Sequence, residues 1–238
     1  MNEVERHAVT QPARFVDITV SPDLEDRVLL GVITAGGIVV RAEAPAVWAE
    51  IDRVAESCRR RFAGKAPREI AELQPARELY WRTGEDPTKL RPSSEALLRR
   101  VLRGESLYRI NSLVDSCNLC SLKFLLPIGL YDLDRITGRV EARLGRAGEA
   151  YDSLGKGRYA VDGRLALFDD LGPFGSPTND SRRTAITEAT RRCLMVIFAP
   201  TRYSRDDLRG HLTTAAGYLR NLVGAAEIET MVIPPRDL

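Results

Sequence analysis

The sequence predicts an α+β fold, in which helices pack on a mixed β-sheet core. Two observations carry this prediction. Segments such as residues 45–62 and 93–103 place apolar residues at helical spacing, with charged residues on the opposite face. Residues 139–168 instead read as short strands that glycines interrupt, and further strands are expected near both ends of the chain. We therefore expect one domain that contains both kinds of element.

The first 80 residues are predicted to hold strands and two helical stretches. Residues 15–20 alternate as a strand, and residues 27–40 read as two strands around a Gly-Gly turn. Residues 45–62 form an amphipathic helix that opens at a proline suited to the first helical turn. A second helical stretch is expected over residues 67–80.

Two further helices are predicted in the middle of the chain. After Pro92, Ser93 or Ser94 can cap a helix that runs through Arg103 and stops at Gly104. The next helix covers residues 111–124 and ends before a proline, which cannot continue it.

The last third of the chain is predicted to be mainly strand. Residues 139–168 form short strands, and residues 169–179 are loop by composition. Residues 194–198 form a fully apolar strand, residues 204–222 a helix, and residues 227–233 a last strand.

Length and composition favour a single globular domain. The chain has 238 residues, of which 44% are hydrophobic and 29% charged, as in ordinary soluble proteins. No apolar run approaches the roughly 20 residues that cross a bilayer, and the first residues lack the order of a signal peptide. We expect a cytoplasmic protein without a membrane partner.

The net charge of +2 does not by itself indicate nucleic-acid binding. Basic residues nevertheless gather in one stretch, where Glu95 and Glu105 oppose five arginines: Arg91, Arg99, Arg100, Arg103 and Arg109. Such a patch can meet phosphate, but a solvated helix face is the simpler interpretation.

Cys117 and Cys120 form a CxxC pair, which is typical of a redox site or half of a zinc site. No second CxxC or CxxH follows, and the histidines, His7 and His211, lie near the two ends. We therefore expect buried free thiols and no metal or other cofactor. The absence of a central histidine also argues against a Ser/His/Asp or Cys/His catalytic group.

Polar residues mark the helix at 111–124. Asn111, Asp115 and Asn118 follow each other at spacings of four and three residues, so they share one face. A buried polar group without a hydrogen bond costs roughly 1–3 kcal/mol, so these side chains must anchor either the chain's own backbone or a ligand. In the turn that follows, Asp132 and Asp134 suit a metal or acid/base site, but aspartates that cap backbone amides are favoured.

Residues 107–134 resemble the signature of the B3/B4 domain in the β subunit of bacterial phenylalanyl-tRNA synthetase, in which an I-N-x-V-V-D-x-x-N helix runs into P-L-x-A-[FY]-D-L-D. The matching residues are Ile110, Asn111, Leu113, Val114, Asp115, Asn118, Pro127, Tyr131, Asp132, Leu133 and Asp134. The segments GEDPTKLRPSSEALLRRVLRG and DSRRTAITEAT are similar to free-standing B3/4 proteins. The resemblance implies one B3/4-like domain over residues 1–238, with a core near 81–200 that residues 15–80 and 204–234 complete.

The synthetase domain hydrolyses tyrosine wrongly esterified to the phenylalanine tRNA. The resemblance therefore implies an editing pocket that hydrolyses the ester of a mischarged tRNA, in trans. An activated ester needs an oriented water and a stabilised oxyanion, and no catalytic histidine or cofactor is then required.

The same resemblance assigns roles to residues. Gly129, Thr178, Asn179 and Asp180 are expected at the catalytic centre, and the loop with Gly172 and Gly175 would offer backbone amides to the ester. Residues expected to bind substrate or to position that loop are Tyr131, Arg183, Thr184 and Glu188. Asn111, Asp115 and Asn118 would brace the turn that holds Asp132 and Asp134, and Arg91, Arg99, Arg100 and Arg103 would meet tRNA phosphates.

This chain departs from the synthetase pattern in two places. Gly129 stands where the synthetase domain has histidine, and its Gly-Gly-rich loop is not reproduced by LGPFGSPTND. Two alternatives therefore stay open: a non-catalytic module that binds tRNA or aminoacyl-tRNA, and a pocket for a free unusual amino acid.

Overall fold

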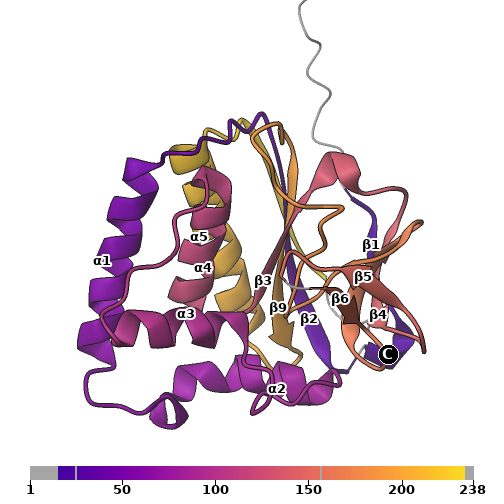
Figure 1. Ribbon diagram of the computed structural model, residues 1–238, viewed down its shortest axis with the longest axis horizontal. Helices are drawn as coiled ribbons and strands as arrows, with labels where there is room; N and C mark the ends of the chain where they lie inside the picture. The colour runs from indigo at the N-terminus through magenta and orange to yellow at the C-terminus, as the bar shows by residue number, and fades with distance from the viewer. Residues whose placement is uncertain (1–15, 25, 156, 234–238) are drawn as a thin grey trace, which may run out of the picture.

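The computed structural model describes residues 16–24, 26–155 and 157–233. Its elements form three layers, with the helices on one side, a central sheet in the middle and a second sheet on the other side (Figure 1). The prediction that a strand starts at position 15 falls outside the described residues, and β1 begins at Ile18. The α+β fold class is confirmed.

The helices are α1 (Pro45–Arg61), α2 (Gln74–Arg82), α3 (Ser93–Leu102), α4 (Ser112–Phe124) and α5 (Arg205–Val223). The strands are β1 (Ile18–Val20), β2 (Val28–Gly36), β3 (Ile128–Asp132), β4 (Val140–Leu144), β5 (Ala150–Asp152), β6 (Arg158–Ala160), β7 (Leu165–Asp169), β8 (Gly172–Gly175), β9 (Cys193–Pro200) and β10 (Glu227–Ile233). Short 3-10 turns lie at Pro22–Leu24, Pro67–Glu69, Ala71–Leu73 and Leu133–Arg135.

The central sheet has the order β10-β2-β9-β3, and every neighbouring pair is antiparallel. Its inner strands β2 and β9 are buried along their whole length, because α4 and α5 cover one face and the second sheet covers the other. The second sheet has the order β1-β4-β7-β8 and contains a parallel pair, β1 with β4. A third apolar cluster joins α1, α3 and α4.

Three local predictions are wrong. Residues 27–40 hold the single strand β2 (Val28–Gly36) instead of a hairpin, because β9 and β10 pair with it on both edges and a strand buried on both faces reads as one apolar run. The helical stretch predicted at 67–80 is present, and it begins with two 3-10 turns before α2. Part of the expected loop at 169–179 is β8. The N-cap of α3 is Pro92, without a side-chain cap from either serine.

Helix α4 is anchored at its N-terminus by two of the predicted polar residues. The Asn111 side chain is the N-cap and accepts hydrogen bonds from the backbone N–H groups of Leu113, at 3.1 Å, and Val114, at 2.9 Å. Asp115 is fully buried, and its carboxylate accepts from the Trp48 indole at 2.8 Å and from the Ile110 N–H at 3.0 Å. The carboxylate therefore ties α4 to α1.

None of the helices in the described part of the chain combines the length and the apolarity needed to cross a bilayer.

The anchoring role of Asp115 is testable. Asp115→Asn keeps the shape of the side chain but replaces one carboxylate oxygen by an NH2 group. This group then faces the N–H of either Trp48 or Ile110, so we expect a loss of roughly 1.5–3 kcal/mol in the free energy of unfolding. Urea denaturation followed by circular dichroism measures it. Asn118→Ala, one turn further along α4, is the matched control and should change stability by less than about 0.5 kcal/mol. Equal midpoints for the two variants would contradict the anchoring role.

Candidate functional site

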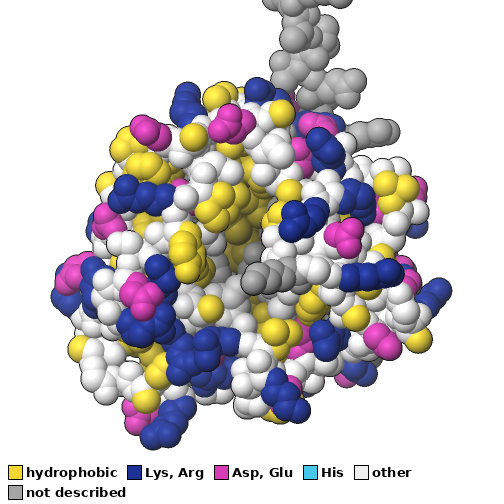
Figure 2. Space-filling view, viewed as in Figure 1, with side chains coloured by type: hydrophobic (Ala, Val, Ile, Leu, Met, Phe, Trp, Pro, Cys, Tyr) yellow, Lys and Arg dark blue, Asp and Glu magenta, His cyan; other side chains and the backbone are white. Residues whose placement is uncertain are grey.

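A cavity of about 570 Å³ lies between α3, α4, β3 and the segment 176–186. Figure 2 shows it as a hollow with an apolar floor at the centre of the molecule. Most of its lining is apolar and includes Leu97 of α3, Val114 of α4, and Ile128 and Leu130 of β3. A cavity of this size and polarity is typical of a small-molecule site.

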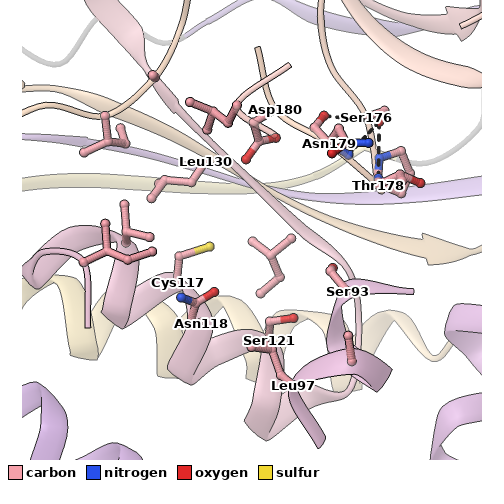
Figure 3. A pocket seen from close by; sticks show the side chains of 18 residues that line it. Ser93, Leu97, Cys117, Asn118, Ser121, Leu130, Ser176, Thr178, Asn179 and Asp180 are labelled. Carbon is pink, nitrogen blue, oxygen red and sulfur yellow. Dashed lines mark hydrogen bonds between the residues drawn. The ribbon is translucent and has the colours of Figure 1, made fainter. Parts of the chain in front are cut away.

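A few polar side chains enter this apolar cavity. Asp180, Cys117 and Asn118 point toward the same space from opposite walls (Figure 3). The side chains of Asn118 and Asn179 have no hydrogen-bond partner within the described ranges, so both amides are available to a ligand. The structure therefore moves Asn118 from the predicted bracing role to the cavity wall.

Asp180 is the carboxylate of the cavity. Burial raises its pKa to about 7, while the Tyr131 hydroxyl and the Leu130 backbone N–H act in the opposite direction. Burial raises the pKa values of Tyr131, Cys117 and Tyr151, and the charge of Asp180 raises them further. These neighbours are neutral near pH 7, so Asp180 lies in an uncharged setting and changes protonation near neutral pH.

The segment 176–180 that carries Asp180 is a tight turn. The Ser176 Oγ accepts from the backbone N–H groups of Thr178, at 3.2 Å, and Asn179, at 3.0 Å (Figure 3). The expectation that these amides face an ester is therefore wrong, because a serine oxygen of the same turn already uses both.

Buried tyrosines and a glutamate hold the outer side of this turn. The Thr178 hydroxyl donates to the Glu85 carboxylate at 2.8 Å, and the Tyr159 hydroxyl donates to the same carboxylate. Tyr80 donates to the Pro177 carbonyl at 3.0 Å, and Tyr151 to the Asn179 carbonyl at 2.5 Å. Thr178 is thus a fixed part of the turn, with its hydroxyl bonded to Glu85.

Gly129 and Tyr131 do not line the cavity, contrary to prediction. Side chains alternate along β3, so Ile128 and Leu130 face the cavity while Tyr131 packs between the two sheets. There its ring meets Phe174 edge-on, with centroids 5.0 Å apart. A Cβ at Gly129 would lie 2.0 Å from the Tyr131 hydroxyl oxygen, so no side chain fits at 129 while Tyr131 holds this position.

Gly172 and Gly175 are also outside the cavity lining. Both belong to β8, which pairs with β7, and Gly172 has a φ of 111°, a conformation that favours glycine. A Cβ at Gly175 would lie 2.3 Å from the Tyr131 hydroxyl oxygen. Gly175 therefore gives room to the tyrosine, and the predicted glycine wall is absent from the cavity.

Asp132 and Asp134 fill structural roles, as favoured. The Asp132 carboxylate accepts from the Thr190 hydroxyl at 2.7 Å and from the Asp134 N–H at 3.1 Å, and Asp134 pairs with Arg192. The segment that includes Thr190 thus braces this turn. The expectation that the polar stripe of α4 braces it is wrong.

The remaining predicted residues lie beside the cavity. Arg183 makes two hydrogen bonds of 2.8 Å to the buried carboxylate of Asp169, which ties down the start of segment 183–190. Thr184 is buried and bonds the Ser181 hydroxyl at 2.8 Å. Glu188 is exposed in a turn and caps no helix. All three shape the surroundings of the cavity without lining it.

The predicted arginine patch lies on α3 and the loop after it. Figure 2 shows basic side chains gathered below the hollow, over α3. Arg100 and Arg103 both pair with Glu105, and Arg91 lies 3.9 Å from Glu95. Arg99 has no hydrogen bond or ion pair from its side chain in the described part of the chain.

The four cysteines are free and buried, in agreement with the sequence interpretation. Within the described residues, no group of three or more His, Cys, Asp or Glu side chains is placed to hold a metal ion.

Sequence reasoning missed Glu85 and the polar surroundings of the 176–180 turn. Glu85 lies in a segment rich in turn formers, and its partner Thr178 is 93 positions away. No local sequence pattern predicts such a pair.

No curated protein matches the chain. Among solved structures, an N-terminal fragment of the phenylalanyl-tRNA synthetase β-subunit from Pyrococcus horikoshii is similar over 94% of this chain and 55% of that chain, at 12% identity and a TM-score of 0.47. The chain thus spans about half the length of that fragment.

The family model described as the B3/4 domain matches residues 75–219. This range contains α3, α4, β3 and the 176–180 turn, which together enclose the cavity. The chain therefore belongs to the B3/4 domain family.

Proposed function

We propose that the protein hydrolyses the ester bond of a mischarged aminoacyl-tRNA and acts in trans. One observation carries the proposal: Asp180 lies in a largely apolar cavity and has a pKa of about 7. A general base works best when its pKa lies near the working pH, and a buried carboxylate without a charged partner reaches that value. The resemblance to the editing domain of the synthetase supplies the class of substrate.

The reaction needs only the groups in the cavity and one water. Asp180 in its ionised form takes a proton from the water, and the water oxygen attacks the ester carbonyl carbon. The bond from that carbon to the ribose oxygen then breaks, and the ribose oxygen takes the proton from Asp180. The products are a free amino acid and uncharged tRNA.

Asn118 suits the role of donor to the oxygen that becomes negative. Its amide points into the same space as Asp180, and its side chain has no hydrogen-bond partner among the residues described. Side-chain amides serve as such donors in other enzymes, where the loss of one costs about 10²–10³ in rate.

The arginine patch borders the cavity and fits the phosphates of an acceptor stem. Its helix α3 contributes Leu97 to the cavity wall, so a bound backbone would run next to the pocket. Beyond α3, Tyr108 is 67% exposed, and the Arg100 guanidinium lies 4.2 Å from its ring centre. Exposed aromatic rings beside arginines are typical of surfaces that bind single-stranded ends of nucleic acids.

The first test is hydrolysis itself. Purified protein is incubated with tRNAs that carry a panel of amino acids, including non-proteinogenic ones, and the release of amino acid is measured. We expect release from at least one member, and Asp180→Asn should lower kcat/KM by about 10²–10⁴. The rate should rise through about pH 7 and level off above it, because the base acts when ionised. Tight tRNA binding with an intact ester throughout would identify a binding module instead.

Asp180 also predicts a pH-dependent cost in stability. Its pKa of about 7 in the folded protein lies above its usual value of 3.8, so folding takes up a proton between these values and stability falls as the pH rises through that window. We expect Asp180→Asn to be more stable than the wild type at pH 8, by more than about 1 kcal/mol, and to lose this advantage near pH 4. Urea titrations at both pH values measure the difference, and a constant difference would contradict the burial of this charge.

Charge reversal tests whether the arginine patch binds tRNA. Replacing Arg99, Arg100 and Arg103 by Glu should slow hydrolysis of aminoacyl-tRNA and reduce the slope of log affinity against log salt concentration by roughly 2–3. The matched control reverses Arg59, Arg60 and Arg61 of α1, which carry the same charge outside the cavity wall. Hydrolysis of a small amino-acid ester should be unaffected in both variants. Hydrolysis of aminoacyl-tRNA that is unaffected by the reversal would instead favour a pocket for a free amino acid or its ester.

A further inference from the structure

The Tyr131 hydroxyl is an unusual buried group. The side chain is fully buried between the two sheets, and its oxygen has no hydrogen-bond partner in the described structure. A buried hydroxyl without a partner costs roughly 1–3 kcal/mol relative to one that is bonded. A phenylalanine would fill the same space without this cost, so packing alone does not explain the hydroxyl.

The structure makes room for this oxygen with two glycines. Ideal Cβ atoms at Gly129 and Gly175 would lie 2.0 Å and 2.3 Å from it, far inside any real contact. One glycine lies on β3, two residues before Tyr131, and the other ends β8, so they come from different sheets. The chain thus keeps two positions free of side chains around a single hydroxyl.

The same slot touches the cavity through Asp180. Gly175 forms an isolated antiparallel bridge with Asp180, so the residue that bounds the slot lies opposite the residue whose carboxylate enters the cavity. The Tyr131 hydroxyl therefore lies next to the strand position that pairs with Asp180. No hydrogen bond of normal geometry joins the two side chains in this state.

We propose that Tyr131 is a positioning residue for Asp180: its hydroxyl reaches through the slot between Gly129 and Gly175 and donates a hydrogen bond to the ionised carboxylate. This inference rests on the proposed function only for its effect on the reaction. The hydrogen bond itself requires no substrate.

The electrostatics of the site agree with this role. The Tyr131 hydroxyl lowers the pKa of Asp180, and Asp180 raises that of Tyr131, as expected for a donor that favours the charged form of its acceptor. The other titratable groups affected by Asp180 are Cys117 from α4 and Tyr151 from β5, and burial raises the pKa of both. Among the described residues, the tyrosine is the one side-chain donor that acts on the pKa of Asp180, beside the Leu130 backbone N–H.

Tyr131→Phe tests the inference because it keeps the ring and its contact with Phe174 and removes only the oxygen. The pKa of Asp180 is measured by carbon NMR of carboxyl-labelled aspartate, with Asp180→Asn to assign the signal. We expect Tyr131→Phe to raise this pKa by about half to one unit, since the charged form loses a donor. Tyr151→Phe is the matched control, because the Tyr151 hydroxyl bonds the 176–180 turn and not the carboxylate.

An unchanged or lowered pKa in Tyr131→Phe would overturn the inference. Equal shifts in both variants would also overturn it, because they would indicate a general loosening of the turn. Where an ester is hydrolysed, Tyr131→Phe should lower kcat more than it changes KM and move the midpoint of the pH profile upward by the same amount. Failure of every ester would sink the proposed function alone, since the NMR measurement needs no substrate.

Discussion

Alternation of side chains along one edge strand is the constraint on which this site depends. Strand β3 pairs with β9 on one side, and its other edge is free of the central sheet. Odd and even residues of the strand must face opposite layers. Leu130 therefore faces the helices and lines the cavity, while Tyr131 faces the second sheet. The free edge is where the Leu130 N–H acts on Asp180, so one short strand connects cavity, carboxylate and hydroxyl.

The rest of the domain keeps the cavity walls in place at a cost in stability. Asp115 and Asn111 use their hydrogen bonds to fix the helix, whereas the side chain of Asn118, on the same helix, has no partner among the described residues. Likewise, Glu85, Tyr80 and Tyr151 bond the 176–180 turn from outside, while burial raises the pKa of Asp180. Uncompensated polar groups inside a rigid, satisfied frame are typical of functional sites.

The sequence predicts the local parts of this structure well. Amphipathic spacing locates α1 and α4, and a run of apolar residues locates β9, because both patterns follow from burial of one segment. The single strand β2 is not predicted, because the Gly-Gly pair at 36–37 reads as a hairpin turn. The motif of α4 also identifies the family, because its residues lie close together in the chain.

The site is less predictable because its contacts join distant segments. Asn111, Asp115 and Asn118 share one helical spacing but differ in role. Asp115 binds Trp48, whereas Asn118 faces the cavity. Gly129 reads from sequence as a backbone that approaches substrate. In the structure it is a backbone that approaches Tyr131, two residues along the same strand.

The glycine at 129 also bears on the chemistry. Because the Tyr131 oxygen occupies the space of a side chain at 129, a histidine there and the tyrosine in its present position exclude each other. A histidine would titrate near pH 6.5, and Asp180 titrates at about pH 7 through burial. On the proposed function, Asp180 then supplies the neutral-pH base in a site whose packing leaves no room for a histidine at 129. The tyrosine that closes the histidine position is the group that reaches the carboxylate.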